Sequence, residues 1–222
     1  MRIAPLLLAL PLLQEADPRP FTEAFVVDEK DLGPTGANPF FILEPGYELV
    51  LEDPKDKEVL AIRVLDETRK VGGVETRVVE ERETVDGKLV EVSRNFFAIC
   101  RKTNGVYYFG EEVDLYKDGV LRGHSGAWLH GEKGARFGLM MPGTPLLGAR
   151  HYQEIAPGEA MDRAEVVSLA EALEVPAGRF ENVLKVEETT PLEPGEKEYK
   201  YYARGVGLLK DGGCRLVRYG KK

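Results

Sequence analysis

The feature that most constrains this chain is a series of glycine turns that separate runs of alternating residues. Each turn begins with Asp or Asn and lies between stretches rich in aliphatic and aromatic residues: Asp86-Gly87, Asn104-Gly105, Asp118-Gly119 and Asp211-Gly212-Gly213. Asp-Gly and Asn-Gly pairs tolerate the positive φ angles that two-residue hairpin turns require. Four such turns therefore predict antiparallel strands joined by hairpins.

The runs between these turns have the two-residue period of strands. In the run 74–85 (VETRVVEERETV), Thr76, Val78 and Glu80 fall on one face, and the run 57–68 is rich in β-branched and aliphatic residues. Alternation with one charged face is typical of an antiparallel strand that has one side in water. These runs indicate strands rather than helices.

One segment, residues 160–173 (AMDRAEVVSLAEAL), also suits a helix because it contains good helix formers. Val166, Val167 and the neighbouring turn at 175–178 favour a strand there. We therefore predict an all-β fold with little helix, in which an antiparallel meander forms a barrel, a half-barrel or a sandwich.

The N-terminus carries the pattern of a secretory signal. A single Arg after Met1 is followed by the apolar run 3–13 (IAPLLLALPLL) and then by polar residues. The run is shorter than the roughly 20 residues that span a bilayer, and no later segment is apolar enough to cross one. We expect residues 1–16 to be a signal peptide cleaved after Ala16, so that the protein is exported to the periplasm, the cell surface or the medium. The alternative is a buried N-terminal segment of a cytosolic protein.

The remaining chain suits one domain. Residues 17–37 are rich in Pro, Gly and Asp and predict a linker, while residues 38–222 have the length of a single β domain. Phe40 and Phe41 lie between two prolines and predict an anchor packed on the domain edge. With 43% hydrophobic residues, the domain has enough apolar side chains for a core.

The charge and the absence of known motifs exclude several classes of function. The formal net charge of -8 argues against non-specific binding to nucleic acid and against docking on an anionic membrane. The sequence contains no GxGxxG, P-loop, HExxH or nucleophile-elbow motif, so we predict no cofactor, no metal site and no catalytic residue.

Two cysteines, Cys100 and Cys214, leave two alternatives open. In an oxidising compartment they could form a disulfide that closes a long loop. Otherwise they are two separate buried thiols that act as small apolar residues. Their wide separation does not match a metal-binding motif.

Several sequence phrases occur together and in order: NPFFILEPG (38–46), VYYFGEE (106–112), MPGTPLLG with YQEIAPGEAMDRAEV (141–148 and 152–166), and the long piece 175–210 that begins VPAGRFENVLKVEETTPLEPG. On these phrases, which cover most of the chain after residue 38, the protein resembles a family of uncharacterised exported bacterial all-β proteins. No activity is established for that family. The resemblance implies export and an all-β domain, and it implies no mechanism.

Histidines are the main candidates for chemistry. His151 and Glu154 could form an acid–base pair or a metal site, beside Tyr152, if a third group joins them. His124 and His130 are six residues apart, about 20 Å along a strand, and could share a metal only if the glycines around them bend the chain. A secreted hydrolase or metal-dependent enzyme that uses His151 and Glu154 is therefore one alternative.

Aromatic side chains give the other candidate site. They cluster on predicted strands and either line an apolar cavity or fill the core. We expect Trp128 at the mouth of such a cavity and Met140 in its wall. The function we predict is an exported, non-enzymatic β domain that binds a small apolar ligand or a protein partner, with a structural surface module as a further alternative. The candidate ligand-binding residues are Trp128, His124, His130, His151, Tyr152, Glu154, Met140 and Tyr108.

Overall fold

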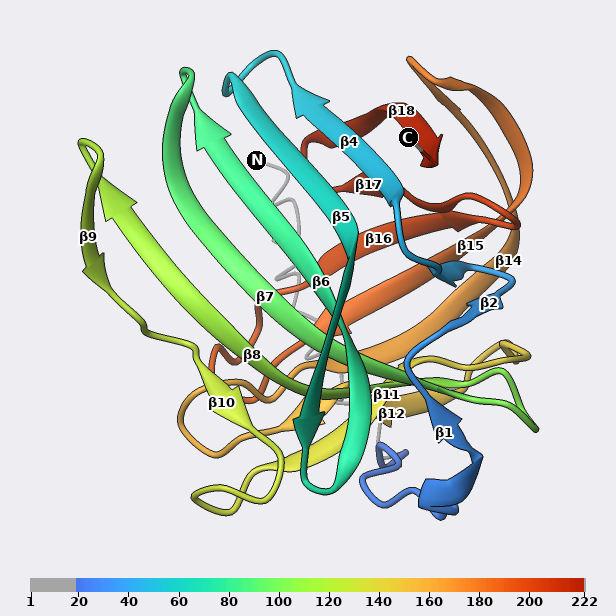
Figure 1. Cartoon of the computed structure of the whole chain (residues 1–222). Coiled ribbons are helices and arrows are strands. Elements are labelled where there is room, and N and C mark those ends of the chain that lie inside the picture. Colours follow the sequence, from blue (N-terminus) through green and yellow to red (C-terminus); the bar gives the residue numbers. More distant parts are fainter. Residues whose placement is uncertain (1–18, 222) are drawn as a thin grey trace, which may run out of the picture.

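A computed structural model of the chain, shown in Figure 1, describes residues 19–221. It is 64% strand and 1% helix, which confirms the predicted all-β fold. The helix is a single 3-10 turn, η1 (Glu29–Asp31). The strands are β1 (Leu32–Gly33), β2 (Gly36–Asn38), β3 (Phe41–Leu43), β4 (Tyr47–Asp53), β5 (Glu58–Val71), β6 (Val74–Val85), β7 (Lys88–Cys100), β8 (Val106–Lys117), β9 (Val120–Gly123), β10 (Trp128–Leu129), β11 (Arg136–Met141), β12 (Arg150–Tyr152), β13 (Glu154–Ile155), β14 (Arg163–Val175), β15 (Gly178–Thr189), β16 (Glu198–Ala203), β17 (Gly207–Asp211) and β18 (Cys214–Lys221).

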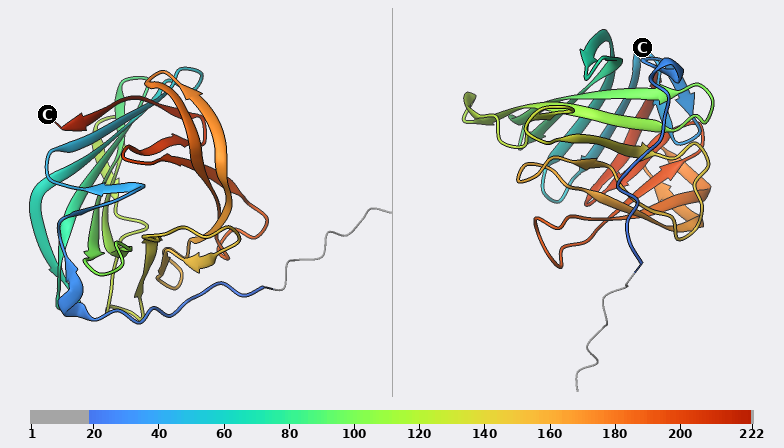
Figure 2. Two further views of the ribbon diagram at one scale, coloured as in Figure 1. Left: turned by 90° about the vertical axis from the view of Figure 1, so that its right-hand side faces the viewer. Right: turned by 90° about the horizontal axis from the view of Figure 1, so that it is seen from below.

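β2 and β3 pair in a separate two-stranded sheet. The other strands form one antiparallel sheet that rolls into a nearly closed, barrel-like shape, as Figure 2 shows. Its order is β12-β14-β15-β16-β17-β18-β4-β5-β6-β7-β8-β11-β13. Strands β12 and β13 stand at opposite ends of this order, yet only Gln153 separates them in the chain. The backbone therefore joins the two edges of the sheet, and of the three predicted shapes the barrel describes it best.

The predicted turns occupy the ends of strands. Asp86-Gly87 and Asp118-Gly119 join β6 to β7 and β8 to β9, and all four residues have φ between 51° and 75°. These are the left-handed angles that favour Asp and Gly. Gly212-Gly213 joins β17 to β18, whereas Asn104 (φ 57°) lies in a longer loop between β7 and β8.

The segment with the open helix alternative is a strand. Residues 163–175 form β14, which pairs with β15 along its whole length. The strand prediction is therefore confirmed. Pairing with a neighbour that carries alternating apolar residues outweighs the helix propensity of the alanines here.

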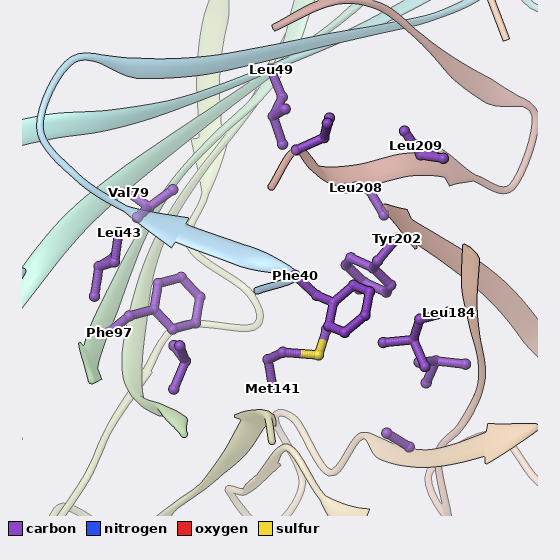
Figure 3. Close-up of a cluster of buried hydrophobic side chains, with 14 of the residues drawn as sticks. Phe40, Leu43, Leu49, Val79, Phe97, Met141, Leu184, Tyr202, Leu208 and Leu209 are labelled. Carbon is purple, nitrogen blue, oxygen red and sulfur yellow. The ribbon is translucent and has the colours of Figure 1, made fainter. Parts of the chain in front are cut away.

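The sheet separates two apolar clusters. Successive residues of a strand point to opposite faces, so Val79 and Phe97 lie in the inner cluster while Val78 and Phe96 lie in the outer one. Figure 3 shows the inner cluster, in which Val79 and Phe97 face side chains from the opposite wall of the barrel such as Leu184 and Tyr202.

Phe40 fills the middle of the inner cluster, between these walls (Figure 3). It is 5% exposed, so the expectation that it packs on the domain edge is wrong. Asn38 holds the segment in place: its Nδ2 donates to the carbonyls of Asn104 (2.7 Å) and Pro142 (3.0 Å), and its Oδ1 accepts from the Phe40 amide (2.8 Å). The buried Asn38 side chain thus fixes the turn that places the Phe40 ring inside the barrel.

The N-terminal region runs along the outside of the barrel. Of the predicted linker, the structure describes residues 19–37, in which Thr22 bridges to His151 and Leu32 pairs with Cys100. Phe25 packs edge-on against Tyr107 of the outer cluster. The predicted signal peptide, residues 1–16, lies outside the described residues.

Cys100 and Cys214 are both free and buried, and they belong to the outer and inner clusters respectively. The disulfide alternative is therefore not realised in this structure, because the sheet stands between the two clusters.

No helix within residues 19–221 is long and apolar enough to cross a membrane.

Candidate functional site

The inner face of the sheet changes from apolar to acidic along its strands. On β6, Glu81 and Glu83 follow Val79 at two-residue steps and so share its inward face. On β7, Ser93 and Glu91 are their cross-strand partners. The register thus places carboxylates inside the barrel beyond the inner cluster.

These carboxylates line a cavity of about 410 Å³, which we call the acidic cavity. Six of its ten lining residues are acidic, and they come from five strands on both sides of the barrel. They are Glu58, Glu81, Glu83, Glu91, Glu198 and Asp211. Leu60 and Cys214 add an apolar part to the wall.

The inward cation near this cavity is already engaged. Lys200 Nζ lies 2.9 Å from Glu188 Oε2 and 3.5 Å from Asp211 Oδ2. Burial alone would lower the pKa of Lys200, but the two carboxylates outweigh it and hold that pKa well above its ordinary value. Gln153 Nε2 also donates to Glu188 (2.9 Å). Lys200 is thus held beside the cavity through Asp211, which lines it.

The other carboxylates of the cavity repel one another in a poorly solvated space. Burial raises the pKa of Glu81 to about 7, against which Lys200 acts, while Asp211 and Glu91 raise it further. The pKa values of Glu83 and Glu91 are also raised by burial. Within residues 19–221, no hydrogen bond or ion pair to Glu81 is found. The cavity therefore disfavours its own full ionisation.

A hydrogen-bonded group continues this acidic face on β7 and β8. The Tyr108 hydroxyl donates to Asn95 Oδ1, and Asn95 Nδ2 donates to Ser93 Oγ (3.0 Å). Burial, followed by the charges of Glu81 and Glu91, raises the pKa of Glu111 to about 8, although the nearby hydroxyl groups of Tyr108 and Ser93 act in the opposite direction. Glu111 is thus electrostatically coupled to the acidic cavity.

Trp128 lines a smaller pocket of about 210 Å³ that also contains Glu111, its cross-strand partner. The indole ring is 6% exposed and stands edge-on to Tyr108, with ring centroids 5.1 Å apart. Its Nε1 is buried and donates to no group of residues 19–221. The sequence singled out Trp128 for a cavity, and the structure places it in the wall of this pocket.

His151 and Glu154 are both buried, but their surroundings differ. Burial lowers the pKa of His151 to about 4, with the nearby backbone of Leu139 acting in the opposite direction, and its Nε2 is buried without a hydrogen-bond partner among residues 19–221. Glu154 accepts from the Asp162 amide (2.6 Å), and burial followed by the charge of Asp162 raises its pKa well above the ordinary value. No hydrogen bond or ion pair between residues of the 19–221 range joins His151 to Glu154, so the acid–base pair of the enzyme alternative is not assembled.

The remaining candidates lie away from the two cavities. His124 Nδ1 is 2.9 Å from Asp114 Oδ1 on the surface. His130 Nδ1 accepts from the Phe137 amide (3.2 Å), and its ring packs on the outer cluster. Tyr152 packs on Phe21, with ring centroids 6.1 Å apart.

Met140 lies against the inner cluster, 3.5 Å from Gln153 Nε2. In the part of the chain that the structure describes, no three His, Cys, Asp or Glu side chains are grouped so that they could hold a metal ion. The sequence reasoning did not find Glu81, Glu91 or Lys200. Val79 and Glu81 are two residues apart and therefore share one face of the strand. Once Val79 is known to point inward, the sequence predicts that Glu81 points inward as well.

Comparisons with known proteins add little to this site. No family model and no curated protein matches the sequence. A solved structure of a Parabacteroides distasonis protein, assigned provisionally as a lipoprotein, is similar with a TM-score of 0.37 and 13% identity, over 84% of this chain and 100% of that chain. A match at that level carries no argument about this chain.

Proposed function

We propose that this chain is an exported, non-enzymatic β domain that binds a small organic cation inside its barrel. The observation that carries the proposal is the acidic cavity, in which six carboxylates surround about 410 Å³. That volume lies within the roughly 300–1,000 Å³ of small-molecule sites. The carboxylates favour a cationic ligand over the wholly apolar ligand expected from the sequence.

Electrostatics supply the driving force for this binding. Lys200 is shared between Glu188 and Asp211 and offsets only part of the raised pKa of Glu81, so a ligand cation would add counter-charge for the carboxylates of the cavity. An opposite charge within about 4–6 Å lowers the pKa of a carboxyl and releases the cost of its burial. Leu60 offers an apolar contact for the rest of the ligand.

Export rests on the N-terminal pattern and on the family resemblance. A charged start, an apolar run at residues 3–13 and a small residue at Ala16 favour cleavage before Asp17. N-terminal sequencing of the protein purified from its own host tests this step. We expect the sequence to begin at or near Asp17, and intact Met1 on protein from the cytoplasm would contradict export.

Titration calorimetry with benzylamine at pH 8 tests the ligand class. We expect binding to the unmodified protein and a loss of about tenfold or more in affinity in the double variant E81Q/E91Q, which removes two charges from the cavity. The matched control is E181Q, because Glu181 is an exposed carboxylate paired with Arg179 outside the cavity.

Circular dichroism of each variant shows whether the sheet is retained. Equal affinity in E81Q/E91Q and E181Q would contradict a site in the acidic cavity. Calcium chloride is titrated in parallel; heat with calcium and none with benzylamine would replace the organic cation by a metal ion. Native mass spectrometry of the protein from its host then identifies what is bound.

A further inference from the structure

We propose that a groove on the outer face of the barrel is a second binding site, which takes the carboxylate group of a small organic acid. The groove encloses about 570 Å³ and lies on β14 and β15, beneath the N-terminal segment. Among its lining residues are Phe21, Arg163, Val167 and Thr189. The site is separate from the acidic cavity and does not depend on its function.

The strand register places these side chains outside the barrel. Ala164 belongs to the inner cluster, so its neighbours Arg163 and Glu165 point outward. Their cross-strand partners on β15 are Thr189 and Glu187. The outer face of two paired strands thus forms the floor of the groove.

The N-terminal segment provides a wall. Thr22 exchanges backbone hydrogen bonds of 2.9 Å with Arg150 and Tyr152, which fixes the neighbouring Phe21 over β12. The guanidinium carbons of Arg150 and Arg163 lie 4.0 Å and 4.7 Å from the centre of the Phe21 ring. An aromatic ring and a guanidinium therefore meet at one place, which suits an acid with an apolar body.

Of the three carboxylates that line the groove, Glu165 and Glu187 have partners of their own, and the third, Glu196, is exposed to solvent. Glu165 is paired with Arg19 (2.9 Å) and Arg150 (3.2 Å). Glu187 is paired with Lys197 (2.8 Å) and accepts from the Tyr199 hydroxyl (2.8 Å). These ion pairs offset the negative charges of Glu165 and Glu187, so the two carboxylates repel a bound anion less.

Arg163 differs from its neighbours because it has no acidic partner within residues 19–221, and its Nε is buried without a hydrogen bond. A planar guanidinium binds a carboxylate through two parallel hydrogen bonds. The Thr189 side chain, opposite Arg163 in register, is positioned to add a hydroxyl. These groups favour a carboxylate over an amine as the ligand of the groove.

Titration calorimetry at pH 7 with benzoate tests the inference, with benzyl alcohol as the probe that keeps the ring and lacks the charge. We expect benzoate to bind and benzyl alcohol not to bind. R163Q should weaken benzoate by about tenfold or more, and R163K by less, because lysine keeps the charge but not the planar fork. R179Q is the matched control, since Arg179 is an exposed arginine of β15 paired with Glu181.

The outcomes separate this site from the acidic cavity. Benzoate binding that is lost in R163Q and retained in R179Q and E81Q/E91Q supports the groove. Equal benzoate affinity in R163Q and R179Q, or no benzoate binding at all, overturns it. Should R163Q unfold, R163K gives the decision: unchanged affinity in that variant contradicts recognition by the guanidinium.

Discussion

The same strands build two parts of the barrel interior, one filled with apolar side chains and the other hollow and acidic. Around Phe40 the inner cluster is filled, with Val79 1% and Leu184 1% exposed. Two residues further along β6, Glu81 faces a cavity of about 410 Å³. One step of the strand period thus separates a packed apolar site from an acidic one.

The contrast shows which part of the interior stabilises the fold and which part destabilises it. Burial of Val79 and Phe97 is favourable in proportion to the apolar area removed from water. By comparison, ionising Glu81 in its cavity is unfavourable, since its pKa is raised to about 7. Side chains that cost stability and satisfy no partner are typical of binding sites. Four substitutions sharpen or break this contrast.

Phe40→Ala should have the largest effect. The ring is 5% exposed in the middle of the inner cluster, so its removal leaves a cavity and should lower the free energy of unfolding by about 3–5 kcal/mol. Guanidinium unfolding followed by circular dichroism measures the loss. Leu147→Ala is the control: that side chain is 68% exposed, and we expect a change within about 0.5 kcal/mol. A cost below about 1 kcal/mol for Phe40→Ala would show that this part is not a packed core.

Lys200→Met should have the next largest effect. It leaves the mostly buried Glu188 and Asp211 without their cation, and we expect a loss of about 2–3 kcal/mol at pH 8 in the same unfolding measurement. Lys197→Met is the control, because Lys197 pairs with Glu187 at the surface and should contribute at most about 1 kcal/mol. Similar losses for both variants would mean that the Lys200 network is no more buried than a surface pair.

Most of the fold could be predicted from the sequence because hairpin turns and strand alternation are local. Asp86-Gly87 and Asp118-Gly119 form the turns that their φ preferences dictate. Long-range pairing decided the rest. Residues 106–117 form the single strand β8, because it pairs continuously with β7 apart from one bulge.

The candidate site was harder to predict because it depends on which face of each strand turns inward. The run 74–85 carries Glu80 on one face and Glu81 on the other, and alternation alone cannot tell them apart. Only the contacts of Val79 with the opposite wall identify Glu81 as inward. The role of Lys200 likewise depends on its pairing with Asp211 across the β16–β17 hairpin, which the sequence alone does not reveal.

Glu81→Gln should stabilise the protein in a pH-dependent way. A carboxyl whose pKa is raised from 4.5 to about 7 in the folded state keeps its proton there while the unfolded chain loses it, so the free energy of unfolding falls as the pH rises from about 4.5 to 7. The variant lacks this loss and should be more stable by about 1–3 kcal/mol above pH 7, and equal below pH 4.5.

Thermal unfolding at pH 4, 6 and 8 tests this difference. Glu80→Gln is the control, because Glu80 lies next along β6 and faces Arg82 (3.8 Å) and Arg94 (3.9 Å). A pH-independent difference between Glu81→Gln and the unmodified protein would remove Glu81 from the acidic part of the interior.

Trp128→Phe should have the smallest effect, and it tests where the boundary between the two parts lies. The substitution removes contacts with Tyr108, but it also removes a buried Nε1–H that has no partner among residues 19–221. An unpaired buried donor costs about 1–3 kcal/mol, comparable with the packing that is lost, so the net change should stay within about 1 kcal/mol. Trp128 belongs to the same buried cluster as Phe40, so a loss of more than about 2 kcal/mol would mean that its packing there outweighs the cost of the unpaired donor. Trp128 is the single tryptophan of the chain, so its fluorescence in the unmodified protein gives an independent measure. If Glu111 couples the Trp128 pocket to the acidic cavity, benzylamine should change this fluorescence and benzoate should not.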